Sequence, residues 1–155
     1  MKTAWIIIAM AGAALAGDFS AGLAAYNKGD FAAALKEWKP LADTGSRDAQ
    51  YNLGLLYMDG KGVPKSYEEA AKWFERAANQ GQLEAQHNLG AMYGGGLGVR
   101  RDYVQAYKWE SVCAARGNSG CASQRDALEK KLKGSKLAEA QRLATDFKPK
   151  DEPSK

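Results

Sequence analysis

The sequence contains few of the side chains from which most metal centres and acid–base sites are built. There are two cysteines and one histidine among 155 residues. A metal site with several His or Cys ligands cannot be assembled from that number, and a single histidine leaves few routes to histidine-based general acid–base catalysis. We therefore expect no metal, no cofactor and no catalytic residues, and we predict that the protein is not an enzyme.

The chain also has no strong excess of charge of either sign. Lysine and arginine number 22 against 18 acidic residues, which gives a net charge of +4 that is scattered along the sequence. A dedicated nucleic-acid binder needs a concentrated basic face, so nucleic acid is excluded as the expected partner. Hydrophobic residues make up 45% of the chain, which is enough for a packed core.

No hydrophobic run is long enough to predict a membrane-spanning helix. The apolar stretch after Lys2 covers about 15 residues, and roughly 20 are needed to cross a bilayer. Ala14-Leu15-Ala16 has the small-x-small pattern that precedes a signal-peptidase cleavage site. We predict that residues 1–16 are a signal peptide cleaved between Ala16 and Gly17, with an uncleaved N-terminal anchor as the alternative. The mature protein is then expected in a bacterial periplasm, or secreted, without stable membrane insertion.

Beyond the leader, residues of the same kind recur every 36 positions. Aromatic residues, alanines and glycines all follow this period: Phe31, Tyr67 and Tyr103; Ala34, Ala70 and Ala106; Gly45, Gly81 and Gly117; and Leu53-Gly54 with Leu89-Gly90. A fixed period in this range is typical of stacked helical repeats.

Each unit is predicted to form two helices, because its apolar residues have helical spacing. The first helices are expected at 31–44, 67–80 and 103–116, and the second helices at 48–58, 83–93 and 119–132. Asp30, Ser66 and Asp102 are placed as N-caps. Gly54 and Gly90 lie within second helices, where close approach of a neighbouring helix would offset the cost of a mid-helix glycine.

These patterns predict an all-α protein of three repeats with modified ends. We assign a leading half-repeat to residues 17–29, repeats to 30–65, 66–101 and 102–133, a capping helix to 134–147 and a disordered tail to 148–155. The third repeat has a degenerate second helix.

The segment Ala49-Gln-Tyr-Asn-Leu-Gly-Leu-Leu-Tyr57, followed by Gly60-x-Gly62-Val63 and by Tyr67-x-x-Ala70-x-x-Trp73-Phe74, resembles the Sel-1-like repeat (SLR). This family is related to the tetratricopeptide repeat, and the match covers residues 30–117 most strongly. The resemblance implies a right-handed α-solenoid that acts as an adaptor or scaffold for other proteins. Exported bacterial members are linked to envelope assembly, secretion and contact with hosts.

We therefore predict an exported scaffold that binds a protein or peptide in its concave groove. Two alternatives remain. One is a β-lactam or peptidoglycan hydrolase activity, as described for cysteine-rich relatives, although no nucleophile–base pair is visible here. The other is a secreted factor that meets a host.

The two cysteines, Cys113 and Cys121, flank the Gly117 turn and replace Ala77 and Ala85 of the preceding unit. Small residues at both positions suggest that the two helices meet there, and an oxidising compartment favours a disulfide. The Cys-x7-Cys spacing resembles the cysteine-rich exported branch of the family. The alternative is two independent buried thiols.

Candidate partner-binding residues lie on the first helices. Lys36, Lys72 and Lys108 recur in register and would form a basic stripe that meets an acidic segment; the alternative is three solvated side chains. Trp73, Trp109 and Tyr107 are candidate anchors in the same groove, although the tryptophans also suit packing between units. We interpret His87 as a polar residue at the surface or groove edge.

Overall fold

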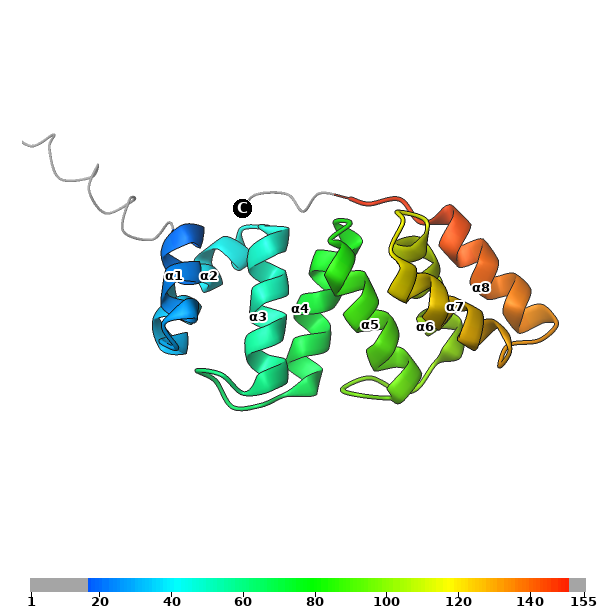
Figure 1. The fold of residues 1–155 in the computed structure, drawn as a ribbon, viewed down its shortest axis with the longest axis horizontal. Helices are drawn as coiled ribbons and strands as arrows, with labels where there is room; N and C mark the ends of the chain where they lie inside the picture. Colours follow the sequence, from blue (N-terminus) through cyan, green and yellow to red (C-terminus); the bar gives the residue numbers. More distant parts are fainter. Residues whose placement is uncertain (1–16, 151–155) are drawn as a thin grey trace, which may run out of the picture.

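The computed structural model describes residues 17–150, and these fold into helices joined by turns (Figure 1). The helices are α1 (Phe19–Asn27), α2 (Phe31–Asp43), α3 (Arg47–Asp59), α4 (Tyr67–Asn79), α5 (Leu83–Gly95), α6 (Tyr103–Ala114), α7 (Ser119–Glu129) and α8 (Ser135–Asp146). The predicted signal peptide, including Ala16, lies outside the described residues. Within residues 17–150, no helix combines enough length and apolar character to cross a bilayer.

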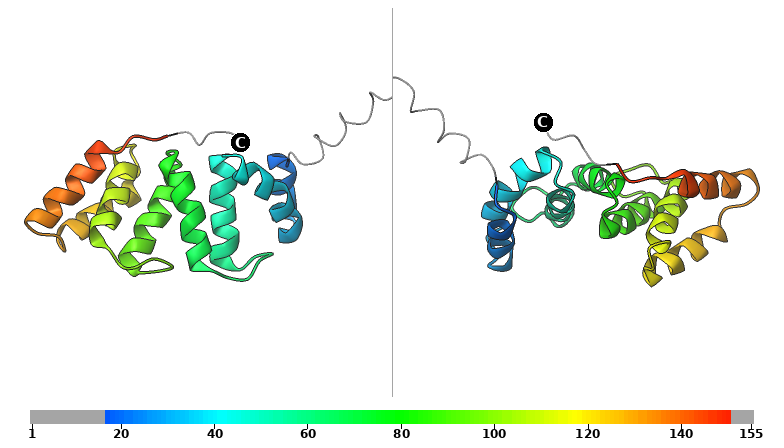
Figure 2. Two further views of the ribbon diagram at one scale, coloured as in Figure 1. Left: turned by 180° about the vertical axis from the view of Figure 1, so that it is seen from behind. Right: turned by 90° about the horizontal axis from the view of Figure 1, so that it is seen from above.

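The helices stand in an elongated row in which each packs against the next (Figures 1 and 2). The last helix breaks this order, because α8 packs mainly against α6. The predicted all-α solenoid is thus confirmed.

The predicted caps explain why the first helix of each unit begins where it does. The carboxylate of Asp30 accepts a hydrogen bond from the Ala33 amide, the Ser66 hydroxyl accepts one from the Glu69 amide, and Asp102 accepts from Val104 and Gln105. These bonds satisfy amide groups that have no partner inside the helix.

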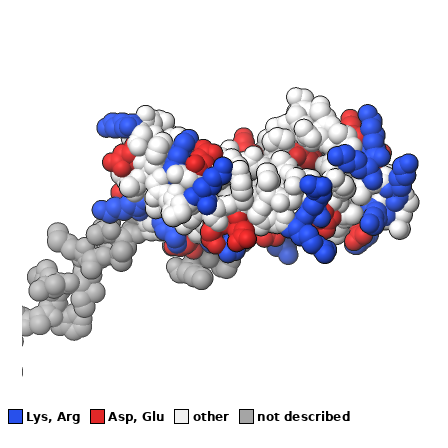
Figure 3. Space-filling model, turned by 90° about the horizontal axis from the view of Figure 1, so that it is seen from below, with Lys and Arg blue, Asp and Glu red and all other residues white. Residues whose placement is uncertain are grey.

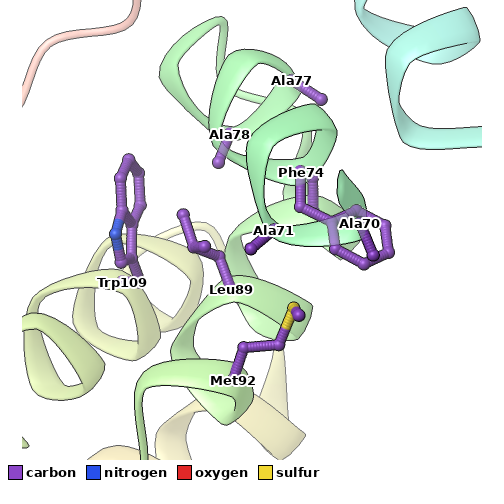
Figure 4. Close-up of a cluster of buried hydrophobic side chains, with 9 residues drawn as sticks. Ala70, Ala71, Phe74, Ala77, Ala78, Leu89, Met92 and Trp109 are labelled. Atoms are coloured by element: carbon purple, nitrogen blue, oxygen red, sulfur yellow. The ribbon is translucent and has the colours of Figure 1, made fainter. Parts of the chain in front are cut away.

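The core is a series of clusters, each shared by adjacent helix pairs. Figure 4 shows the central one, where alanines of α4 allow α5 and α6 to approach closely. It contains Ala70, Ala71, Phe74, Ala77, Ala78, Ala85, Leu89, Met92 and Trp109. A second cluster surrounds Trp38, and a third joins α6, the end of α7 and α8. Each unit therefore completes its core with residues from its neighbours, as expected for a repeat protein.

The close approach predicted at Gly54 is present. A Cβ at this position would overlap the ring of Phe74 on α4. The glycine therefore lets α3 and α4 pack face to face, which offsets its cost within a helix.

Residues 148–150, which the sequence analysis assigns to the disordered tail, have a defined position, and the rest of that segment lies outside the described residues. The ring of Phe147 packs edge-on against Trp109, with centroids 5.2 Å apart. The Lys150 amide donates a hydrogen bond to the Asn79 carbonyl over 2.9 Å. The chain consequently turns back from α8 toward the end of α4 (Figure 1).

Candidate functional site

The three lysines of the predicted stripe lie in different environments. Lys36 is exposed. Lys72 is exposed too, but its ammonium forms an ion pair with Glu69 over 2.6 Å. Lys108 is half-buried, with its Nζ 4.0 Å from the centroid of the Trp109 ring. Burial lowers the pKa of Lys108, and the charge of Glu75 opposes this effect. The lysines therefore do not form a uniform row of free cations.

The aromatic residues of the predicted groove contribute mainly to the core. Trp73, Tyr107 and Trp109 have exposed fractions of 8%, 6% and 2%. Trp109 belongs to the central cluster and Trp73 to the cluster around Trp38. In this arrangement the three side chains offer little surface to a partner.

His87 has a partner that the sequence interpretation missed. Its Nδ1 lies 2.9 Å from a carboxylate oxygen of Glu110. The Glu110 side chain is 1% exposed, whereas that of His87 is 40% exposed. Burial raises the pKa of the Glu110 carboxyl, and the hydrogen bond and charge of His87 oppose the shift. The structure thus contains a buried carboxylate held by an imidazole that reaches the surface.

The 36-residue period accounts for the position of this pair. His87 and Glu110 occupy the positions of Tyr51 and Phe74 in the preceding unit, where the two rings pack with centroids 5.8 Å apart. Gly90 corresponds to Gly54, and a Cβ added at Gly90 would lie 2.9 Å from the Glu110 carboxylate. An ionisable pair therefore replaces an aromatic pair at the same place in the fold.

The cysteines lie beside this pair. Cys113 on α6 and Cys121 on α7 are fully buried and form a disulfide with a Cα–Cα distance of 5.8 Å, which confirms the predicted bridge. Ligand atoms of His87, Glu110 and Cys121 all lie within 4.8 Å of one another. The absence of a metal site stays a prediction; it was based on the number of His and Cys residues and did not consider a buried glutamate at a core position.

A cavity lies elsewhere, between the α5–α6 loop, α6, the α7–α8 connection and α8. Its volume is about 450 Å³. We call it the basic cavity because four of its lining residues are cationic and two are acidic: Arg100, Arg101, Lys131 and Lys136, with Asp102 and Glu139. Figure 3 shows basic side chains at this end of the molecule and others at the opposite end. The Nζ of Lys131 also lies 4.9 Å from the centroid of the Tyr103 ring. The sequence analysis did not identify this cavity, because its residues come from α6, α8 and the two connecting segments that precede these helices.

The Sel1 repeat model matches the chain twice, at residues 47–82 and 83–109. The first match is one full 36-residue period that begins at α3. In the Sel1 family model, a repeat therefore begins with the helix that is second in each repeat predicted here.

Two solved structures are similar over much of the chain. One is a protective antigen present in uropathogenic Escherichia coli strains that displays an SLR fold, with a TM-score of 0.76 and 35% sequence identity over 81% of this chain. The other is a Sel1 repeat protein from Oxalobacter formigenes, with a TM-score of 0.62 and 37% identity over 64% of this chain. The chain spans only 28% and 29% of those two proteins. No curated protein matches the sequence.

Proposed function

The chain carries Sel1 repeats in an SLR-fold solenoid, and from this premise we propose that it is an exported scaffold that binds an acidic segment of another envelope protein. Sel1 repeats support a role in protein–protein interaction, and this observation carries the proposal. Their solenoids expose a long surface relative to their core, which suits docking to another chain.

The basic cavity is the surface that best fits such a segment. Its volume is about 450 Å³, and its lining has an excess of positive charge. Arginine can bind a carboxylate through two hydrogen bonds, and lysine adds charge without this directionality. The alternative binding surface is the face of α2 and α4 that carries Lys36 and Lys72.

Export to the periplasm is part of the proposal. The leader-like sequence of residues 1–16 and the disulfide both favour an oxidising compartment outside the cytoplasm. The Escherichia coli relative is a protective antigen, a property that agrees with an exported protein. The alternative is release into the medium, and fractionation of the processed protein would distinguish the two.

Affinity capture from the envelope fraction tests the proposal with two matched baits. Arg100→Glu/Lys136→Glu reverses two exposed cations at the basic cavity, and Lys36→Glu/Lys72→Glu reverses two on the first helices. Both change the net charge by the same amount. We expect a partner that binds the native chain and the second variant but not the first. Loss of the partner with the second variant alone would assign binding to the first helices. If no bait retained a protein, the proposal that the chain is a scaffold would be contradicted.

A hydrolase acting on β-lactams or peptidoglycan is the remaining alternative. Proteins of this repeat family and fold are generally interaction modules rather than catalysts. Covalent labelling of the purified protein by a tagged penicillin would support the hydrolase and contradict our proposal.

A further inference from the structure

Four chemically reactive residues stand at positions that are apolar or aromatic one 36-residue period earlier. His87, Glu110, Cys113 and Cys121 stand where the preceding unit has Tyr51, Phe74, Ala77 and Ala85. The set includes the only histidine and both cysteines of the chain. The preceding period shows that the fold needs none of these four side chains for packing, because the aromatic and alanine residues there fill the equivalent space.

The four side chains converge in the folded protein. One ligand atom each of His87, Glu110 and Cys121 lies within 4.8 Å of the other two, and the disulfide holds the sulfur of Cys113 against that of Cys121. In a tetrahedral zinc site with bonds of about 2.0–2.3 Å, neighbouring ligand atoms lie roughly 3.3–3.8 Å apart. Small side-chain rotations would therefore bring this set to zinc-binding geometry.

The cluster is accessible from the surface on one side. A cavity of about 290 Å³ is lined by His87, Gly90 and Glu110, with Tyr103 and Lys131 at its rim. The imidazole is partly exposed while the carboxylate and both sulfurs are buried. A cation entering the cavity would therefore meet the imidazole and carboxylate first and the sulfurs behind them.

We propose that reduction of the Cys113–Cys121 disulfide converts this cluster into a zinc site with His87, Glu110 and the two cysteine thiolates as ligands. In the oxidised protein the sulfurs are bonded to each other and are not available as thiolates. The site is therefore controlled by the redox state of the bridge: the disulfide links α6 and α7 when oxidised, and the metal links them when the bridge is reduced.

The reduction is an ordinary thiol–disulfide exchange with a dithiol. One thiolate of the dithiol attacks a disulfide sulfur and forms a mixed disulfide, and the second thiol closes the dithiol's own disulfide. Two electrons and two protons pass to the protein, which gains two thiols. Zinc then displaces the two thiol protons, and they go to the solvent.

Zinc is the metal that this ligand set favours. Two thiolates with an imidazole suit Zn²⁺, whereas Ca²⁺ and Mg²⁺ require oxygen ligands. Gly90 contributes by leaving room for Glu110, since a Cβ there would come within 2.9 Å of the carboxylate. The other glutamates near α6 and α7 belong to exposed surfaces, which leaves Glu110 as the carboxylate placed for the site.

Titration of the mature chain with Zn²⁺, before and after reduction by a trialkylphosphine, tests the proposal. The phosphine takes up the oxygen of one water molecule and leaves two protein thiols, and it adds no competing thiol ligand. We expect the reduced chain to bind one equivalent of Zn²⁺ at least about 100-fold more tightly than the oxidised chain. Co²⁺ in place of Zn²⁺ should give the absorption bands of a tetrahedral site with thiolate-to-metal charge transfer.

His87→Tyr is the matched variant, because it introduces the residue found one period earlier, Tyr51, at a partly exposed position. Loss of this ligand should weaken Zn²⁺ binding by roughly 10- to 100-fold and shift the Co²⁺ spectrum. Cys113→Ala/Cys121→Ala, again the residues found one period earlier, should bind no better than the oxidised chain.

Three results would overturn the proposal: equal Zn²⁺ affinity with and without reduction, no uptake by a reduced chain that circular dichroism shows to be helical, or an affinity and Co²⁺ spectrum unchanged by His87→Tyr. If reduction alone unfolds the chain, stoichiometric Zn²⁺ should restore its helix content, because metal binding and folding are coupled in such sites. Failure to restore it would also overturn the proposal.

Discussion

At the residue scale, two glycines within helices show that the effect of adding a Cβ atom depends on the atoms around it. A Cβ at Gly54 would overlap the ring of Phe74, whereas one at Gly94 would meet only the Ala106 Cβ at 3.8 Å. We predict that Gly54→Ala lowers the free energy of unfolding by about 1–3 kcal/mol, because the ring must move out of a packed position. Gly94→Ala should change it by less than about 1 kcal/mol, in the stabilising direction. Urea denaturation measures both, and equal effects would contradict the close packing of α3 on α4.

The His87–Glu110 pair gives a second prediction at this scale. His87→Tyr/Glu110→Phe recreates the aromatic pair Tyr51–Phe74 found one period earlier, and Gly90 leaves room for the ring as Gly54 does for Phe74. Replacing both partners of a hydrogen bond that holds a buried polar group by apolar groups of similar shape is commonly close to neutral or stabilising. We expect the oxidised double variant to be at least as stable as the native chain in thermal denaturation.

The single variant His87→Ala is the control for that experiment. It removes the partner of the buried carboxylate without filling the space, and should lower stability by about 1–3 kcal/mol. A double variant less stable than His87→Ala would show that the pair cannot be replaced by an aromatic one.

Local features of individual residues were predictable from the sequence. Asp30, Ser66 and Asp102 were identified as caps because an N-cap acts on amides only two or three positions away. The His87–Glu110 contact was missed because it joins two helices across 23 positions. Comparison of Glu110 with Phe74, one period earlier, was the signal that could have found it.

At the scale of elements, the disulfide holds the α6–α7 hairpin. The loop-entropy model gives about 2.5 kcal/mol for a bridge that closes so short a loop. Cys113→Ala/Cys121→Ala should lower the free energy of unfolding by about that amount, while keeping the packing that Ala77 and Ala85 have in the second repeat. Urea denaturation of both proteins, without zinc, measures the difference. Unchanged stability would show that the hairpin packing alone fixes α7.

The segment after α8 gives another prediction at this scale. Phe147 packs on Trp109, and Lys108 lies over both rings. Phe147→Ala should lower stability by about 1–2 kcal/mol, since the ring is partly buried and forms an aromatic pair. Fluorescence should shift to the red as water reaches Trp109. Lys148→Ala, at an exposed neighbour, is the control, and an equal shift there would contradict the docking of Phe147.

Helix positions followed from the period, but the path of the last segment did not. The sequence indicated a capping helix over 136–147, and α8 forms at Ser135–Asp146. Its placement against α6 and the return of the chain to Asn79 depend on contacts between distant positions. These contacts occur once in the chain, so no repeat pattern could reveal them.

At the scale of the whole molecule, the period of 36 predicted the architecture and only the general kind of function. Glycines, alanines and aromatic residues recur because every unit must bury the same faces, and this made the solenoid recognisable. A binding surface is free to differ between units. The basic cavity illustrates this point, because Arg100 and Lys131 stand one period after Pro64 and Gly95, which carry no charge.

The most direct measurement of the scaffold proposal is site-specific photo-crosslinking in the bacterium that makes the protein. The cross-linking residue replaces Gln105, which lines the basic cavity, and in a second strain it replaces Lys36. We predict that a protein with an acidic segment is captured at position 105, and that Arg100→Glu/Lys136→Glu abolishes its capture. Cross-linking of no protein at either position, in cells where the processed chain is abundant, would contradict the account.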